Sequence, residues 1–73
     1  MFVDKIKAIM ACKGKTQTDV ADKLNTSRQN ISNKFRRGSI SVEELISIVD
    51  ICDCKLIITD GKGFNIELGK DDI

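Results

Sequence analysis

Between Ser27 and Arg37 the chain carries a dense set of side chains that donate and accept hydrogen bonds, in the run SRQNISNKFRR. The run has no glycine or proline and is compatible with a helix, yet its only large apolar residues are Ile31 and Phe35, one turn apart. A helix with so narrow an apolar stripe contributes little to a core and leaves a broad polar and basic face. The chemistry open to that face is hydrogen bonding and the attraction of anions.

Charge is distributed unevenly along the chain, although the net charge at pH 7 is only +1. Residues 1–40 hold nine Lys and Arg against three Asp, whereas residues 41–73 hold three Lys against eight acidic residues. This asymmetry favours a first half that faces a polyanion and a second half that faces something else. The alternative is chance patterning of a solvated surface.

Catalytic and metal-binding chemistry find little support in the sequence. The chain has no histidine, the commonest general base and a common metal ligand. Cys52 and Cys54 are too close in sequence for a zinc knuckle, and we expect Cys12 and Cys52 to be small core residues on apolar helix faces. We therefore predict that the protein is not an enzyme and has no catalytic residue, metal site or cofactor.

Apolar periodicity and capping residues predict four helices. They cover residues about 2–13, 17–24, 28–36 and 42–53. Thr16 with Asp19, and Ser41 with Glu44, have the spacing of capping boxes at two helix starts. Asn25 can take the left-handed conformation and fits a tight turn between the second and third helices.

The first helix has an apolar pattern of its own. Phe2, Ile6, Ile9 and Met10 fall on one face, which predicts an amphipathic helix. The helix should end near Gly14, a natural C-cap residue.

After residue 54 the periodicity changes to that of a strand. Residues 55–59 form a short segment rich in β-branched residues, and residues 60–63 (DGKG) are typical of a turn. In the segment that follows, Phe64, Ile66 and Leu68 alternate along the chain and so fall on one face. We predict a β-hairpin over about 55–68, followed by a frayed tail. An isolated hairpin is only marginally stable, so it must pack on the helices or on another chain.

Together these elements predict a single, mostly α domain over residues 1–73, with four helices followed by a C-terminal hairpin. No apolar run approaches the ~20 residues of a membrane span, and the N-terminus alternates charge with apolar residues, unlike a signal peptide. The odd number of cysteines fits a reducing compartment. We therefore expect a cytoplasmic protein with no membrane partner.

Residues 16–38, TQTDVADKLNTSRQNISNKFRRG, have the features of a helix-turn-helix, since the small Ala21 lets two helices approach and Ile31 fills the angle between them. This run resembles the helix-turn-helix of lambda-repressor-like (XRE/Cro-type) regulators of phages and bacteria, and the resemblance covers roughly residues 2–53. The chain departs from the family pattern at Asn25, where glycine is usual, and at Lys34, where an apolar residue is usual. A hairpin also stands where the family commonly has a further helix.

The resemblance implies sequence-specific binding of double-stranded DNA, with the third helix in the major groove. The side chains implied to read bases are Arg28, Gln29, Asn33 and Asn30. Those implied to contact phosphates are Gln17, Ser32, Lys34, Arg36, Arg37 and Lys15. Arginine can fork onto guanine, and glutamine or asparagine onto adenine. The alternative for each residue is a solvated polar side chain.

The resemblance further implies a small transcriptional regulator, a dimeric repressor that reads a palindromic operator and is nucleoid-associated when bound. We predict a homodimer through the hairpin, with Ile57 as an outward apolar candidate; the alternative is that the hairpin only caps the monomer core. Two other functions stay open. One is an antitoxin-type DNA-binding partner of a toxin, and the other is a protein-interaction module on the same scaffold.

Overall fold

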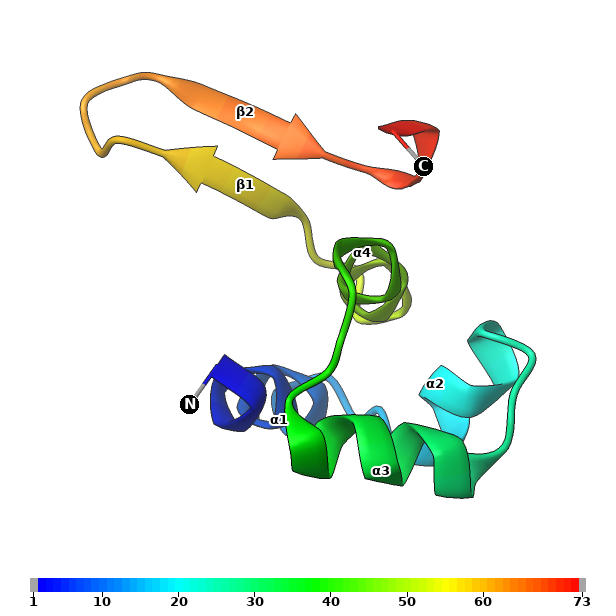
Figure 1. The fold of residues 1–73 in the computed structure, drawn as a ribbon. Coiled ribbons are helices and arrows are strands. Elements are labelled where there is room, and N and C mark those ends of the chain that lie inside the picture. The colour runs from blue at the N-terminus through cyan, green and yellow to red at the C-terminus, as the bar shows by residue number, and fades with distance from the viewer. Residues whose placement is uncertain (1, 73) are drawn as a thin grey trace.

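A computed structural model of the chain describes residues 2–72. Its elements are α1 (Phe2–Cys12), α2 (Gln17–Lys23), α3 (Arg28–Arg37), α4 (Val42–Ile51), β1 (Leu56–Thr59), β2 (Asn65–Leu68) and the short 3₁₀ helix η1 (Lys70–Asp72). Four helices thus precede a two-stranded antiparallel hairpin, which confirms the predicted fold class. Helices α1, α2 and α3 lie on one side of α4 and the hairpin lies on the other (Figure 1).

Two capping boxes begin helices where the sequence predicted them. At the start of α2, the backbone N–H of Thr16 donates to Asp19 Oδ2 at 2.7 Å and the backbone N–H of Asp19 donates to Thr16 Oγ1 at 3.3 Å. At the start of α4, Ser41 and Glu44 make the same reciprocal pair at 2.9 and 3.1 Å. These bonds satisfy backbone donors that have no partner within their own helix.

The connections that flank α3 use the left-handed backbone conformation. Asn25, with φ of 54°, turns the chain between α2 and α3, and Gly38, with φ of 68°, ends α3. Asparagine and glycine adopt this conformation more readily than other residues. Asn25 therefore supplies the turn for which the resembled family uses glycine.

The core is shared by all four helices. Its buried members are Val3, Ile6, Met10, Val20, Ala21, Ile31, Phe35, Ile48 and Cys52. Ile31 and Phe35 are the two buried residues of α3, so the narrow stripe identified in the sequence is what seats this helix. The remainder of α3 stays outside the core.

The buried face of α1 differs from the predicted one. Val3, Ile6 and Met10 are buried, whereas Phe2 is 46% exposed and Ile9 is 40% exposed. Two apolar stripes overlap on this helix at Ile6 and Met10, and the other helices cover only the stripe that includes Val3. Phe2 and Ile9 therefore belong to the apolar face seen in the sequence but not to the core.

The cysteines divide between core and surface. Cys52 is buried, as predicted, and burial, with a further contribution from the neighbouring Cys54, raises the pKa of its thiol. Cys12 is exposed, which overturns its expected place in the core. It is the last residue of α1 and lies beyond the stripe that ends at Met10.

The hairpin has one apolar and one mixed face. Strands β1 and β2 pair with Leu56 opposite Leu68 and Ile58 opposite Ile66, which puts these four side chains on one face. The other face carries two further pairs: Ile57 opposite Glu67, and Thr59 opposite Asn65. This register confirms the predicted alternation.

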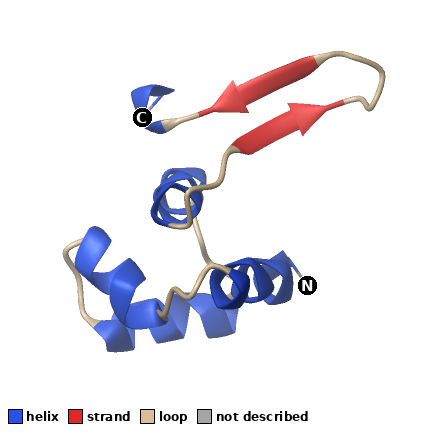
Figure 2. Ribbon diagram, turned by 180° about the vertical axis from the view of Figure 1, so that it is seen from behind, coloured by secondary structure: helices blue, strands red, loops and turns tan. Residues whose placement is uncertain are grey.

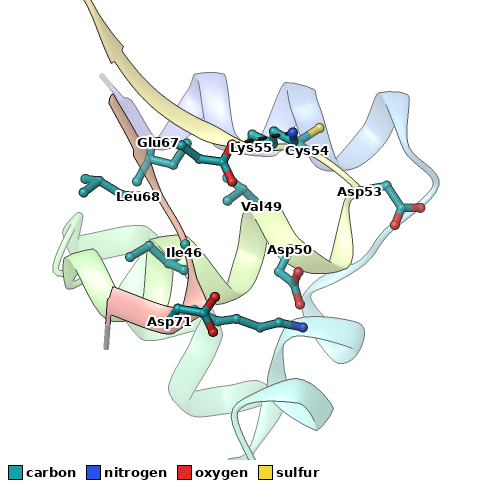
Figure 3. A pocket seen from close by; sticks show the side chains of 12 residues that line it. Ile46, Val49, Asp50, Asp53, Cys54, Lys55, Glu67, Leu68 and Asp71 are labelled. Carbon is teal, nitrogen blue, oxygen red and sulfur yellow. Dashed lines mark ion pairs between the residues drawn. The ribbon is translucent and has the colours of Figure 1, made fainter. Parts of the chain in front are cut away.

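Only the base of the hairpin reaches the helices. Leu56 and Leu68 are half-buried, whereas the rest of both strands is exposed. A hollow of 340 Å³ lies between α4, the hairpin base and η1, with lining side chains that include Val49, Leu68 and Asp71 (Figure 3). The tail is not frayed over residues 70–72, because η1 forms there and Asp72 Oδ2 accepts a 2.8 Å hydrogen bond from the backbone N–H of Gly69.

Candidate nucleic-acid interface

Helices α2 and α3 meet around small and buried residues. Ala21 of α2 and Ile31 of α3 are both almost completely buried, in the positions that the sequence predicted for the helix-turn-helix. The backbone N–H of Thr26 donates to the carbonyl oxygen of Ala21 at 2.9 Å and closes the turn. The position of α3 relative to α2 is therefore set by packing and by a backbone hydrogen bond together.

The face of α3 opposite its buried stripe carries polar side chains. A helix repeats every 3.6 residues, so Gln29, Asn33 and Arg37 lie opposite Ile31 and Phe35. Gln29 and Arg37 are exposed, as are Arg28 and Ser32, whereas Asn33 is half-buried. The structure thus brings most of the predicted DNA-contacting residues onto one solvent-facing surface.

Hydrogen bonds connect three of these side chains along the helix. Gln29 Nε2 donates to Asn33 Oδ1 at 3.5 Å, and Arg36 Nη2 donates to the same oxygen at 2.9 Å. We call Gln29, Asn33 and Arg36 the α3 row. The amide oxygen of Asn33 accepts from both neighbours, so the three side chains form one hydrogen-bonded row along α3.

Asn30 stands apart from the α3 row. Its backbone N–H donates to Ser27 Oγ at 3.1 Å, which caps α3, and its side-chain Nδ2 donates to Thr26 Oγ1 at 2.9 Å. The amide of Asn30 is therefore held against the turn that precedes the helix. Sequence reasoning did not identify Thr26 as its partner, although the spacing of four residues is typical of such a pair.

Lys34 makes an ion pair with the next helix. Its Nζ lies 2.9 Å from Glu44 Oε2, and the two side chains are 30% and 21% exposed. The lysine also lines a small apolar hollow with Leu24 and Ile40, so its methylene stem packs where the resembled family has an apolar residue. No local sequence signal pointed to Glu44 as the partner, because it lies on another helix.

Glu44 has two competing influences on its carboxyl group. Burial raises its pKa, but the backbone N–H of Ser41 and the ammonium group of Lys34 outweigh burial, so that the pKa is lowered overall. The carboxylate is thus stabilised in its charged form while it joins the α4 cap to α3. It fixes both the cap and the end of α3 that carries the basic residues.

The remaining predicted contacts come from two places. Gln17 and Lys15 are half-buried at the start of α2 and in the loop before it, while Arg36 and Arg37 are exposed in the last turn of α3. At the start of α2, the hydrogen bond from Thr16 lowers the pKa of Asp19. A carboxylate therefore lies near the helix N-terminus at which Gln17 was predicted to meet a phosphate.

Comparison with known proteins identifies the architecture. The helix-turn-helix family model matches residues 6–58, which is more than half of the chain. The chain belongs to the lambda-repressor-like (XRE-type) helix-turn-helix family. No curated protein and no solved structure matched it.

This helix-turn-helix protein is a DNA-binding regulator of the XRE type. The family match ends within β1, so β2 and η1 lie outside it. Within residues 2–72, no helix has the length and apolar character needed to cross a membrane. The same residues contain no cluster of three or more His, Cys, Asp or Glu side chains arranged to hold a metal ion.

Proposed function

We propose that this helix-turn-helix regulator is a dimeric repressor that reads a palindromic operator through the exposed face of α3. The observation that carries the proposal is the α3 row, in which Gln29, Asn33 and Arg36 are aligned by hydrogen bonds on the face opposite the core. The amides of Gln29 and Asn33 suit base edges in the major groove, and their alignment with Arg36 means that less side-chain freedom is lost on binding. In this proposal residues 1–73 act as one domain.

Base reading is assigned to three side chains along α3. Arg28 forks onto a guanine, while Gln29 and Asn33 address adenines or neighbouring bases. Asn30 reads a base only if its side chain leaves Thr26, since its amide nitrogen donates to that hydroxyl. We therefore rank Arg28, Gln29 and Asn33 ahead of Asn30.

Phosphate contacts are assigned around this reading surface. They are made by Gln17, Ser32, Lys34, Arg36, Arg37 and Lys15. Such contacts position the protein and carry no sequence information directly. Lys34 must share its charge with Glu44, which lies 2.9 Å away, so its contribution to DNA affinity is expected to be the smallest of the basic residues on α3.

In this proposal the protein represses transcription by occupying its operator, with no cofactor and no chemical step. A dimer on the operator blocks polymerase. One copy measures 40 × 25 × 22 Å, so two copies side by side can present their α3 helices to half-sites about 34 Å apart, one turn of DNA. The site of action is the cytoplasm, on the nucleoid when the protein is bound.

Selection of bound sites from random double-stranded DNA tests the proposal. We expect a palindrome whose half-sites are separated by about 10 base pairs, or one helical turn. Binding should weaken steeply as salt rises, because phosphate contacts release counterions. Recovery of no enriched sequence, or binding that does not change with salt, would contradict DNA reading by α3.

A further inference from the structure

An apolar groove of 260 Å³ lies between α1, α4 and the start of β1. Phe2, Ile9, Leu45 and Leu56 are among its lining residues. Phe2 and Ile9 are the two apolar side chains of α1 that the core leaves uncovered, and the groove contains both. Its charged lining consists of lysine side chains only, and Lys55 among them is paired with Glu67 at 3.5 Å.

The apolar face of the hairpin continues this groove. Leu56 belongs to both, and on the same face of the sheet Ile58 is 58% exposed and Ile66, opposite it, is 48% exposed. Phe64, two residues before Ile66, is 55% exposed. We call the exposed residues Phe2, Ile9, Ile58, Phe64 and Ile66 the hairpin–α1 surface.

The size of this surface matches that of a protein interface. With on the order of 200 Å² for each fully exposed large side chain, its five residues present roughly 450–500 Å² of apolar area. The largest apolar patch on a typical monomer is about 300–600 Å² and is often a functional surface. Since about 60% of an interface is apolar, the patch corresponds to roughly 800 Å² per copy, the size of a standard interface.

We propose that the hairpin–α1 surface binds the same surface of a second copy of this chain. This inference rests on the proposed dimeric function and specifies which surface forms the dimer. The surface has a projecting part, the hairpin, and a recessed part, the groove beside α1, so a two-fold axis lets each hairpin enter the groove of the other copy. The groove is lined by Lys5 and Lys55, and Lys55 is paired with Glu67 of the same chain.

The location of the surface is compatible with DNA binding. Helix α3 and the hairpin lie at opposite edges of the molecule, with α4 between them, in both views of the fold (Figures 1 and 2). Association through the hairpin therefore leaves the α3 row uncovered. It also gives each two-stranded sheet the apolar cover that an isolated hairpin needs for stability.

Matched charge substitutions test the surface, with sedimentation equilibrium of the chain in the absence of DNA as the measurement. Ile58→Glu and Ile9→Glu should each raise the dimer dissociation constant by about tenfold or more, because a carboxylate would leave water for an apolar contact. The controls are Ile57→Lys, next to Ile58 but on the other sheet face opposite Glu67, and Ala8→Glu, next to Ile9 on α1. Both controls should leave the dissociation constant within about threefold of the parent value.

Circular dichroism melts decide whether each variant is folded. If Ile58→Glu does not fold, Ile9→Glu and the milder Ile58→Thr carry the test. Retention of the dimer in the folded Ile9 and Ile58 variants overturns the inference, as does dissociation by Ile57→Lys to the same extent as by Ile58→Glu.

The result also separates this inference from the proposed function. A dimer that reads a palindrome but survives the Ile9 and Ile58 variants overturns the surface alone. A dimer that depends on the surface but selects no DNA sequence overturns operator reading alone. A parent chain that stays monomeric at high micromolar concentration, with and without DNA, overturns both the surface and the dimer, and favours a different protein as its partner.

Discussion

The ammonium nitrogen of Lys34 lies 2.9 Å from a carboxylate oxygen of Glu44, and this ion pair joins α3 to the capping box of α4. The family to which the chain belongs usually has an apolar residue at this position of α3. Here the methylene stem of the lysine packs into the apolar hollow, and its charge is balanced by the next helix. An apparent conflict with the family pattern is thereby resolved by a residue ten positions away.

Replacement of this lysine should therefore be tolerated. Lys34→Met keeps the stem and removes the charge, and we expect a loss of stability of no more than about 1 kcal/mol, because the pair is partly exposed and Glu44 keeps its hydrogen bond from the backbone N–H of Ser41. Urea unfolding measures this. Operator affinity of Lys34→Met should fall less than that of Arg37→Ala, since Arg37 has no comparable carboxylate beside it among the ion pairs of the described residues. A larger loss for Lys34→Met would show that this lysine is a principal phosphate contact.

Glu44 should make stability depend on pH in the acid range. Its pKa is lowered in the folded protein, so the stabilisation it contributes is present above the ordinary glutamate value of about 4.3 and is lost as pH falls through the lower, folded value. Denaturant midpoints between about pH 6 and pH 3 measure the loss. At about pH 6 the Glu44→Gln variant should be less stable than the parent. Its stability should then decrease less than that of the parent as the pH falls to about 3. Parallel curves for parent and variant would contradict a role for this carboxylate.

Arginine substitutions on α3 should separate base reading from phosphate binding. Arg28→Ala should cost about 1–3 kcal/mol on the preferred operator and relax specificity at one base pair, because a bidentate contact is lost. Arg37→Ala should weaken preferred and random DNA by similar factors. Titrations of both DNAs at several salt concentrations measure the two effects. If both variants bind the operator like the parent, the assignment of α3 to the major groove is wrong.

Arg36→Ala should combine both effects. The residue was predicted to hold phosphates, yet its guanidinium group donates to Asn33 Oδ1 at 2.9 Å. Its loss should weaken all DNA sequences and also reduce discrimination at the base that Asn33 contacts, since Asn33 loses a partner that orients it. Comparison with Arg37→Ala on single-base operator variants isolates the second effect. Equal specificity profiles for the two variants would mean that the hydrogen bond does not position Asn33.

The turn before α3 offers a test of the fold itself. Asn25→Gly should retain stability, whereas Asn25→Ala should lose about 1–2 kcal/mol, because alanine is strained at a φ of 54°. Thermal or urea unfolding of the two variants measures the difference. Similar stability for both variants would mean that the turn relaxes to another conformation.

The sequence by itself determined the features that depend on neighbouring residues. Thr16 with Asp19, and Ser41 with Glu44, formed the predicted capping boxes, and Asn25 took the predicted left-handed turn. The alternation of the hairpin was equally clear, since the two-residue period of a strand is a local property. The polar face of α3 also followed from helical period, because only two of its residues are large and apolar.

Tertiary structure alone decided which contacts join residues from different elements. It selected the stripe with Val3 over the one with Ile9, because the other helices cover only one side of α1. It paired Lys34 with Glu44 across two helices. It also left the hairpin attached to α4 only through its base, with an apolar face uncovered. Such choices depend on how whole elements pack, and a helix with two overlapping apolar stripes does not specify by itself which of them is buried.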